Sequence, residues 1–358
     1  MTLEIPENTA QNGAMKLPIA PPALSAAEAE ALIDLWRRGT PENTLRAWER
    51  DLAYIAAWKL LAYGEELAWP ESESVALRFL LEHAQDLSAA SGPAREVAEA
   101  LIAAGLRRSL ACPAPATLDR RIASWRAFHR MKNLPSPFQA PLITEARSRA
   151  RRAAARPRQR KSANPITRAV LEDLLATCDA SHRGLRDRAC LMLGWASGGR
   201  RRAEIVALNR ADIDSDEFAE NGLLRIRLLS TKTTGPALAP RLPLKGRAAR
   251  AVMRWIAVAR IEDGPLFRPV SQADRVLKRR LSADGLRQIL RHRLVLAGYP
   301  ADFASPHGLR AGFLTQAALD HTPLPAAMQL SLHRSVAQAQ SYYADVDIAE
   351  NPATDLLE

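Results

Sequence analysis

A run of like charges near the middle of the 358-residue chain restricts the ways in which it can fold. Residues 147–161 carry eight arginine or lysine side chains and no aspartate or glutamate. Such a block repels itself and resists collapse, so we expect an extended basic linker over residues 141–164. The chain is long enough for two domains with separate cores, one on each side of this linker. The linker either lies along phosphates or is merely solubilising.

Apolar residues recur at three- and four-residue spacing before the linker, a pattern typical of amphipathic helices. The clearest example follows Pro41. Similar segments, divided by Gly, Pro and Ser, predict helices over residues 74–83, 93–104 and 117–129. We therefore predict a helical domain over residues 25–140, preceded by a flexible polar arm over residues 1–24.

The region after the linker combines helical and strand patterns. Residues 223–229 and 241–244 alternate apolar and charged side chains, which predicts two half-buried strands joined by a hairpin. Helical spacing recurs after Pro165 and over residues 185–196, 248–259 and 283–297. We predict a mixed domain over residues 165–343 and an acidic tail over residues 344–358. The expected fold class is mainly α with a small β-sheet, that is, α+β.

The formal net charge of +11 points to a polyanionic partner. Aromatic residues make up 5% of the sequence, so contact with a duplex backbone is favoured over stacking on single-stranded bases. We predict that double-stranded DNA contacts the basic linker and one arginine in the helix after Pro41. These candidates are Arg46, Arg147, Arg149, Arg151, Arg152, Arg156, Arg158, Arg160 and Lys161.

The cysteines and the apolar content bear on the compartment. Cys112, Cys178 and Cys190 form neither a metal-spaced pair nor an even disulfide set, which favours a reducing environment. Residues 1–20 lack the apolar core of a signal peptide, and no stretch is apolar enough to cross a bilayer. We therefore expect a cytoplasmic, nucleoid-associated protein without a membrane partner.

The segment of residues 305–343 holds the densest group of side chains capable of chemistry. Ser305 can cap a helix and Pro306 suits its first position, which places His307 in the first turn. Arg310 follows one turn later on the same face. A helix N-terminus with a histidine and an arginine aimed at one spot describes a phosphate-binding site.

His333 and Tyr342 complete this segment. Nine residues separate them, about two and a half helical turns, so one straight helix would not aim both at one target. We predict a break that leaves them on separate short pieces. Tyr343 competes with Tyr342, because neighbouring helix positions point about 100° apart and one of the two can face the phosphate. The spacing from His333 favours Tyr342.

The order of these residues resembles the tyrosine recombinase (phage integrase) family. Arg201, with Glu204 three residues later, is similar to the family's first arginine box. Ser-Thr-Lys-Thr at residues 230–233 looks like its hairpin lysine, and His-Gly-Leu-Arg at residues 307–310 looks like its second box. The step from His333 to Tyr342 matches the family's nucleophile spacing.

The resemblance covers about residues 27–343, because residues 43–48 open a segment similar to the family's core-binding domain. It implies a helical core-binding domain followed by a catalytic domain. It also implies a metal- and ATP-independent enzyme without a cofactor, in which arginines supply the positive charge. The implied catalytic residues are Arg201, Lys232, His307, Arg310, His333 and Tyr342.

The implied reaction is strand cleavage by the tyrosine, which gives a 3′-phosphotyrosyl link and a free 5′-hydroxyl for rejoining. Arg201 and Arg310 would hold the non-bridging oxygens. His307 would act as the base, Lys232 would protonate the leaving 5′-oxygen and His333 would donate a hydrogen bond to the phosphate. The implied partners are a second duplex, further copies of the chain in a tetramer, and accessory DNA-bending proteins.

One departure from the family pattern precedes His333. Members often have Leu-Gly-His where residues 331–333 read Ser-Leu-His. Leucine does not replace a glycine at positive φ cheaply, so we expect either an ordinary turn or a slightly shifted segment.

Two other functions stay open at this point. A type IB topoisomerase would share the chemistry but relax DNA without exchanging partners, and the helical first half with its basic linker favours the recombinase. A non-catalytic DNA-binding protein of the same fold would not need all six catalytic residues, yet this sequence has a matching residue at each of these positions.

Overall fold

The chain folds into two compact units, residues 1–158 and 159–358. The computed structural model describes residues 25–154, 162–228 and 239–343. The predicted arm and acidic tail lie outside these ranges. So do the candidate residues Arg156, Arg158, Arg160, Lys161 and Lys232.

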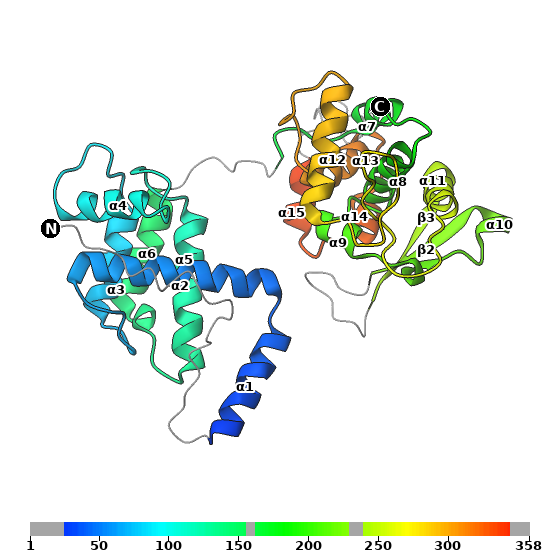
Figure 1. Ribbon diagram of the computed structural model, residues 1–358. Helices are drawn as coiled ribbons and strands as arrows, with labels where there is room; N and C mark the ends of the chain where they lie inside the picture. The colour runs from blue at the N-terminus through cyan, green and yellow to red at the C-terminus, as the bar shows by residue number, and fades with distance from the viewer. Residues whose placement is uncertain (1–24, 155–161, 229–238, 344–358) are drawn as a thin grey trace, which may run out of the picture. The chain divides into compact units, whose positions relative to one another are not determined.

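The described part of the first unit is helical (Figure 1). Its elements are α1 (Ala26–Gly39), α2 (Glu42–Tyr63), α3 (Glu73–His83), α4 (Pro93–Ala103), α5 (Pro115–Met131), the short 3₁₀ helix η2 (Pro137–Gln139) and α6 (Pro141–Ala153). Helix α2 packs against α4 and α5 around an aromatic core that includes Tyr54, Trp58, Phe79 and Trp125. The helices predicted over residues 74–83, 93–104 and 117–129 are confirmed as α3, α4 and α5.

Helix α6 corrects the expectation of an extended linker from residue 141 onward. Residues 141–153 are helical and pack against α3 and η2. Ile143 is buried, and Ala146 and Ala150 also pack on the core of this unit, at three- and four-residue spacing. Pro141 occupies the first turn, where its missing N–H costs nothing. Because this narrow apolar stripe faces the core, the arginines between its members point outward and do not prevent helix formation.

The second unit combines helices with a small sheet. Its elements are α7 (Arg168–Ala176), α8 (His182–Ala196), α9 (Arg202–Ala207), the 3₁₀ helix η3 (Arg210–Asp212), β1 (Ile213–Asp214), α10 (Phe218–Asn221), β2 (Leu223–Arg227), β3 (Arg241–Lys245), α11 (Gly246–Val258), α12 (Ala283–Leu296), α13 (His307–Leu319), α14 (Leu324–Ser331) and α15 (Val336–Tyr343). The sheet is antiparallel in the order β1-β2-β3, and Leu224 lies opposite Leu244. The predicted strands are confirmed as β2 and β3, with a short β1 added at the edge.

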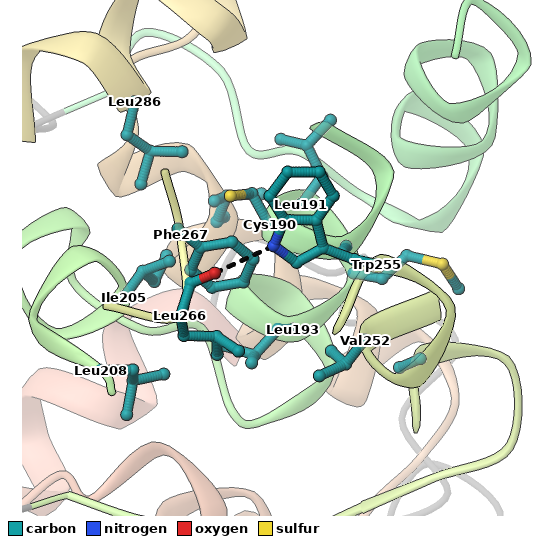
Figure 2. Packing of buried hydrophobic residues seen from close by; sticks show 14 of the residues in the cluster. Cys190, Leu191, Leu193, Ile205, Leu208, Val252, Trp255, Leu266, Phe267 and Leu286 are labelled. Carbon is teal, nitrogen blue, oxygen red and sulfur yellow. Dashed lines mark hydrogen bonds between the residues drawn. The ribbon is translucent and has the colours of Figure 1, made fainter. Parts of the chain in front are cut away.

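The core of the second unit forms where α8 packs against α11, which also contacts β3 (Figure 1). Trp255 on α11 is fully buried, and its indole Nε1 donates a hydrogen bond to the Leu266 carbonyl oxygen at 2.9 Å (Figure 2). Cys190 on α8 lies in the same cluster, where burial raises the pKa of its thiol well above the usual value. This rigid centre fixes α8, and the turn at the end of α8 begins the candidate site.

Candidate active site

The turn between α8 and α9 forms one side of the site. Gly198 and Gly199 both have positive φ, at 95° and 69°. A Cβ atom on Gly199 would lie 2.3 Å from the Arg310 Cα, and one on Gly198 would lie 2.3 Å from the Leu330 carbonyl oxygen. Glycine is therefore required at both positions, because the turn lies directly against α13 and the end of α14.

Helix α13 supplies the predicted histidine and arginine. It begins at His307, whose backbone N–H donates to Ser305 Oγ at 3.3 Å. Pro306 is the N-cap residue, with φ −56° and ψ −18°, and not the first helical residue, so the helix begins one residue later than predicted. Arg310 is 2% exposed, and its Nη1 donates to the Gly199 carbonyl oxygen at 3.1 Å. Burial, and then the neighbouring positive charges of Arg200 and Arg201, lower the pKa of Arg310 to about 10.

The predicted break between His333 and Tyr342 is confirmed. Helix α14 ends at Ser331, α15 begins at Val336, and His333 lies in the loop between them. Leu332 nevertheless adopts the left-handed conformation, with φ 56° and ψ 39°. The expectation of an ordinary turn is therefore wrong, because leucine takes up the left-handed conformation that glycine would adopt at lower cost. The alternative of a slightly shifted segment stays a prediction.

His333 lies against the guanidinium of Arg310. Arg310 Nε is 3.2 Å from His333 Nε2, and Arg310 Nη2 is 3.1 Å from His333 Nδ1. Ser331 Oγ lies 2.8 Å from the same Nδ1. Burial, and then the charges of Arg310 and Arg201, lower the pKa of His333 to about 3. The imidazole is therefore neutral at physiological pH.

Helix α15 brings Tyr342 to the first histidine. Tyr342 Oη lies 3.1 Å from His307 Nε2, within hydrogen-bond distance, and the Tyr342 ring centroid is 6.1 Å from that of His333. Tyr343 is engaged elsewhere, since its hydroxyl donates to the Thr322 carbonyl oxygen at 2.9 Å. The geometry agrees with the spacing argument that favours Tyr342 over Tyr343.

Arg201 precedes α9, and the carboxylate of Glu204 orients it. Arg201 Nη1 donates to Glu204 Oε1 at 2.7 Å, and the Arg201 backbone N–H donates to Glu204 Oε2 at 3.1 Å. The Arg201 side chain is 39% exposed, whereas Glu204 is buried. A partly exposed guanidinium held by a buried carboxylate is pre-oriented to bind an anion from solvent.

The structure therefore brings five of the predicted catalytic residues into one cluster. Arg201, His307, Arg310, His333 and Tyr342 converge on the turn after α8, and Lys232 lies outside the described residues. Arg200 lies in the same cluster but received no role from the sequence. In the sequence it is one additional arginine between the Gly-Gly pair and the arginine box, and no spacing rule assigns it a role.

The candidate DNA-contacting residues that the structure describes lie on α2 and α6. Arg46 forms an ion pair with Glu42 on the same helix. On α6, Arg147 and Arg151 pair with Asp119 at 2.6 and 3.3 Å, and Arg149 pairs with Glu145 at 2.6 Å. Arg152 donates to Ser148 Oγ at 3.4 Å. Contact of these side chains with DNA remains a prediction.

Within the part of the chain that the structure describes, no helix combines the length and apolar character needed to cross a membrane. The same residues contain no cluster of three or more His, Cys, Asp or Glu side chains arranged to hold a metal ion.

The fold and the cluster place this chain in a known class: it belongs to the phage integrase family, whose sequence model matches residues 164–349. Among curated relatives, it is 30% identical over 235 residues to the tyrosine recombinase XerC of Rhodospirillum centenum, covering 65% of this chain and 62% of the relative. It is 28% identical over 180 residues to an integrase/recombinase XerD homologue of Selenomonas ruminantium, covering 48% and 50%. The chain thus spans between half and two thirds of the length of these relatives.

Solved structures confirm the predicted fold class. The Tn1549 transposon integrase in complex with transposon right end DNA matches with a TM-score of 0.55 at 16% identity, over 91% of this chain and 98% of that one. The XerH site-specific recombinase bound to its difH substrate, in a pre-cleavage complex, matches with a TM-score of 0.54 at 15% identity, over 94% and 85%. At such low identity these matches show the fold alone.

Proposed function

We propose that this protein is a site-specific DNA recombinase or integrase that cleaves and rejoins strands through a 3′-phosphotyrosyl intermediate. The observation that carries the proposal is the 3.1 Å contact between Tyr342 Oη and His307 Nε2, beside the guanidinium cluster. A phenol with a base at this distance and cations behind it is the arrangement that attack on a phosphodiester needs.

In the cleavage step, Tyr342 Oη attacks the phosphorus while His307 Nε2 takes the phenolic proton. The bond to the 5′-oxygen breaks, and Lys232 protonates that oxygen as it leaves. Arg201, held by Glu204, faces the non-bridging oxygens from the solvent side, and Arg310 stabilises them from the buried side. Rejoining reverses the same proton transfers, with His307 returning its proton to the phenol.

His333 has a narrower role in this proposal than that of a charged phosphate ligand. Its pKa of about 3 keeps it neutral, so it takes part through one ring N–H and one nitrogen lone pair. A neutral imidazole lies beside Arg310 without opposing its charge. His333 therefore orients the guanidinium: its Nε2 accepts from Arg310 Nε–H, and its one ring N–H, on Nδ1, faces Ser331 Oγ.

We propose double-stranded DNA as the partner, bound as specific recombination sites. Relatives named as recombinases and the net charge of +11 support this partner. Assembly as a tetramer on two duplexes, help from DNA-bending proteins, and a cytoplasmic location beside the nucleoid belong to the same proposal. The division into a core-binding domain, a linker and a catalytic domain is also part of it.

Two alternatives receive less support. A type IB topoisomerase would share the tyrosine chemistry, but the relatives with matching sequence are named recombinases. A non-catalytic DNA-binding protein would have no need of a phenol held at hydrogen-bond distance from a histidine beside buried arginines.

The test is covalent capture of DNA. Sequencing DNA trapped on the protein in its native cell supplies the target site, and a nicked duplex of that site then serves as a suicide substrate. The parent chain should form an adduct that resists SDS, whereas Tyr342→Phe should bind the duplex with unchanged affinity and form none. Tyr343→Phe is the matched control and should keep forming it. An adduct on Tyr342→Phe, or none on the parent chain, contradicts the proposal.

A further inference from the structure

Arg200 is a buried arginine in the site, and the proposed chemistry gives this residue no role. It is 1% exposed, although it lies beside the partly exposed Arg201. Its closest carboxylate oxygen, Glu204 Oε2, is 3.8 Å from Nη1, beyond hydrogen-bond distance. Its Nε has no hydrogen-bond partner among the described residues. A full ion pair therefore does not compensate for the removal of this charge from water.

The contacts of Arg200 reach across to the end of α14. Its Nη2 donates to the Leu330 carbonyl oxygen at 2.8 Å and to the Gly198 carbonyl oxygen at 3.2 Å. Leu330 is in the last turn of α14, where carbonyl groups have no partner within the helix and the helix dipole is negative. The guanidinium thus caps α14 with a donor and a charge of the favourable sign.

The capped carbonyl lies three residues before His333. Between them, Leu332 is held at positive φ, and Ser331 Oγ contacts both the Met328 carbonyl oxygen and His333 Nδ1. Gly198 brings its backbone against the same Leu330 carbonyl. The turn after α8 therefore contacts the end of α14 through Gly198 and Arg200, while the carbonyl oxygen of Gly199 between them accepts a hydrogen bond from Arg310.

From this geometry we propose that Arg200 is a positioning residue that fixes His333 against Arg310 by tying the end of α14 to the turn after α8. A leucine or methionine could fill the same buried volume without a desolvation cost, so packing alone does not account for an arginine here. The proposal rests on the recombinase function proposed above. It adds a residue that acts through His333 and does not touch the phosphate.

The experiment is a double-mutant cycle read by the rate of adduct formation at saturating nicked DNA. Arg200→Met should slow adduct formation by about 10- to 100-fold, since a displacement near 1 Å of a reacting group can cost about 10²-fold. In a His333→Ala background, Arg200→Met should slow it by less than about 3-fold, because the residue through which it acts is already gone. DNA affinity should be unchanged in both backgrounds.

Two further variants keep the inference testable. Arg200→Lys retains the charge and one donor to Leu330, so it should fold and recover part of the rate. Arg202→Met removes one charge from an exposed neighbouring side chain and should leave the rate at saturation unchanged. Equal slowing by Arg200→Met with and without His333, or Arg200→Met and Arg200→Lys proteins that react at the parent rate, would overturn the inference. If the parent chain itself forms no adduct, the proposed function fails instead.

Discussion

At the scale of single residues, the two arginines of the cluster differ in their burial and in the partners that hold them. Arg310 is almost fully buried and bonded to Gly199 and His333, whereas Arg201 is partly exposed and bonded to Glu204. The two guanidiniums are thus fixed by different partners before DNA arrives. Pre-orientation of this kind lets them stabilise charge on the phosphate without rearranging during the reaction.

The first residue-scale prediction concerns these two arginines. Arg310→Ala and Arg201→Ala should each lower the rate of adduct formation by at least about 10²-fold, as removal of an electrostatic stabiliser typically does. Arg310→Ala should also release His333 from its contact, so its loss should be the larger. Single-turnover cleavage of the nicked duplex measures both rates. A rate within about 3-fold of the parent for either variant would remove that arginine from the site.

A second residue-scale prediction concerns pH and a buried histidine of the first unit. His83 is buried, with Tyr54 Oη 2.6 Å from Nε2 and the Phe79 carbonyl oxygen 2.7 Å from Nδ1. Burial lowers the pKa of His83 to about 3. The unfolded chain therefore binds this proton more readily, and the stabilisation is complete above about pH 6.5 and is lost as pH falls toward 3.

The expected slope is about 1.4 kcal/mol of unfolding free energy per pH unit below pH 6 for this one group. Denaturant unfolding at pH 6 and at pH 4.5 measures it. His83→Gln should flatten the slope, and His292→Gln, at an exposed position, should keep it as in the parent chain. A parent-like slope in His83→Gln would show that the neutral state of His83 does not govern acid stability.

The residues of the site were predictable to the extent that spacing determines direction. His307 and Arg310 share a helix face because they are three apart, and the nine-residue step required a break. Arg200 was not predictable in the same way. Its burial follows from a backbone approach at Gly198 and Gly199 that no periodicity reveals.

At the scale of elements, the sequence was most informative where one pattern dominated. Helices α3, α4, α5 and strands β2 and β3 follow apolar periodicity and were found within a few residues. The sequence pattern did not predict helix α6, because its arginines obscure the apolar stripe of Ile143, Ala146 and Ala150. Leu332 shows the opposite limit, since it packs against the main core of the second unit in a backbone conformation that its own side chain disfavours.

The element-scale prediction tests the close approach between the turn after α8 and the end of α14. Gly198→Ala places a Cβ 2.3 Å from the Leu330 carbonyl oxygen, far inside van der Waals contact, and should lower the unfolding free energy by about 3 kcal/mol or more. Gly222→Ala is the control, because Gly222 also has positive φ but faces open space. It should cost about 1 kcal/mol.

Thermal and denaturant unfolding of the two variants measures the difference. Equal losses would mean that positive φ alone sets the cost, and that the approach to Leu330 is not tight in solution.

At the scale of the whole molecule, the chain forms two units with separate cores, and the boundary between them falls within the basic stretch of residues 147–161. The amino-acid composition predicted two units, one on each side of a basic linker. In the structure, the helical part of this linker, α6, belongs to the first unit. In the second unit, α15 packs against α13 of the same chain, so the contact between Tyr342 and His307 is made within one copy.

This contact gives a prediction about mixtures of variants. Tyr342→Phe lacks the nucleophile and Arg310→Ala lacks a stabilising arginine, so each should be inactive alone. Mixing them on one DNA site should restore no cleavage, because each copy uses its own tyrosine. Assays on the nicked duplex with both proteins in equal amounts measure this. Recovery of adduct formation would show that the tyrosine is delivered from a neighbouring copy.

The place of Tyr342 also bears on timing. A subunit that already holds the attacking phenol beside its proton acceptor does not need a second subunit to place the nucleophile. In the proposed reaction, restraint against premature cutting would therefore act on a component other than delivery of the nucleophile, for example on delivery of the proton to the departing strand. Synchrony among subunits would then be a matter of when that proton is released, since no subunit waits for a borrowed nucleophile.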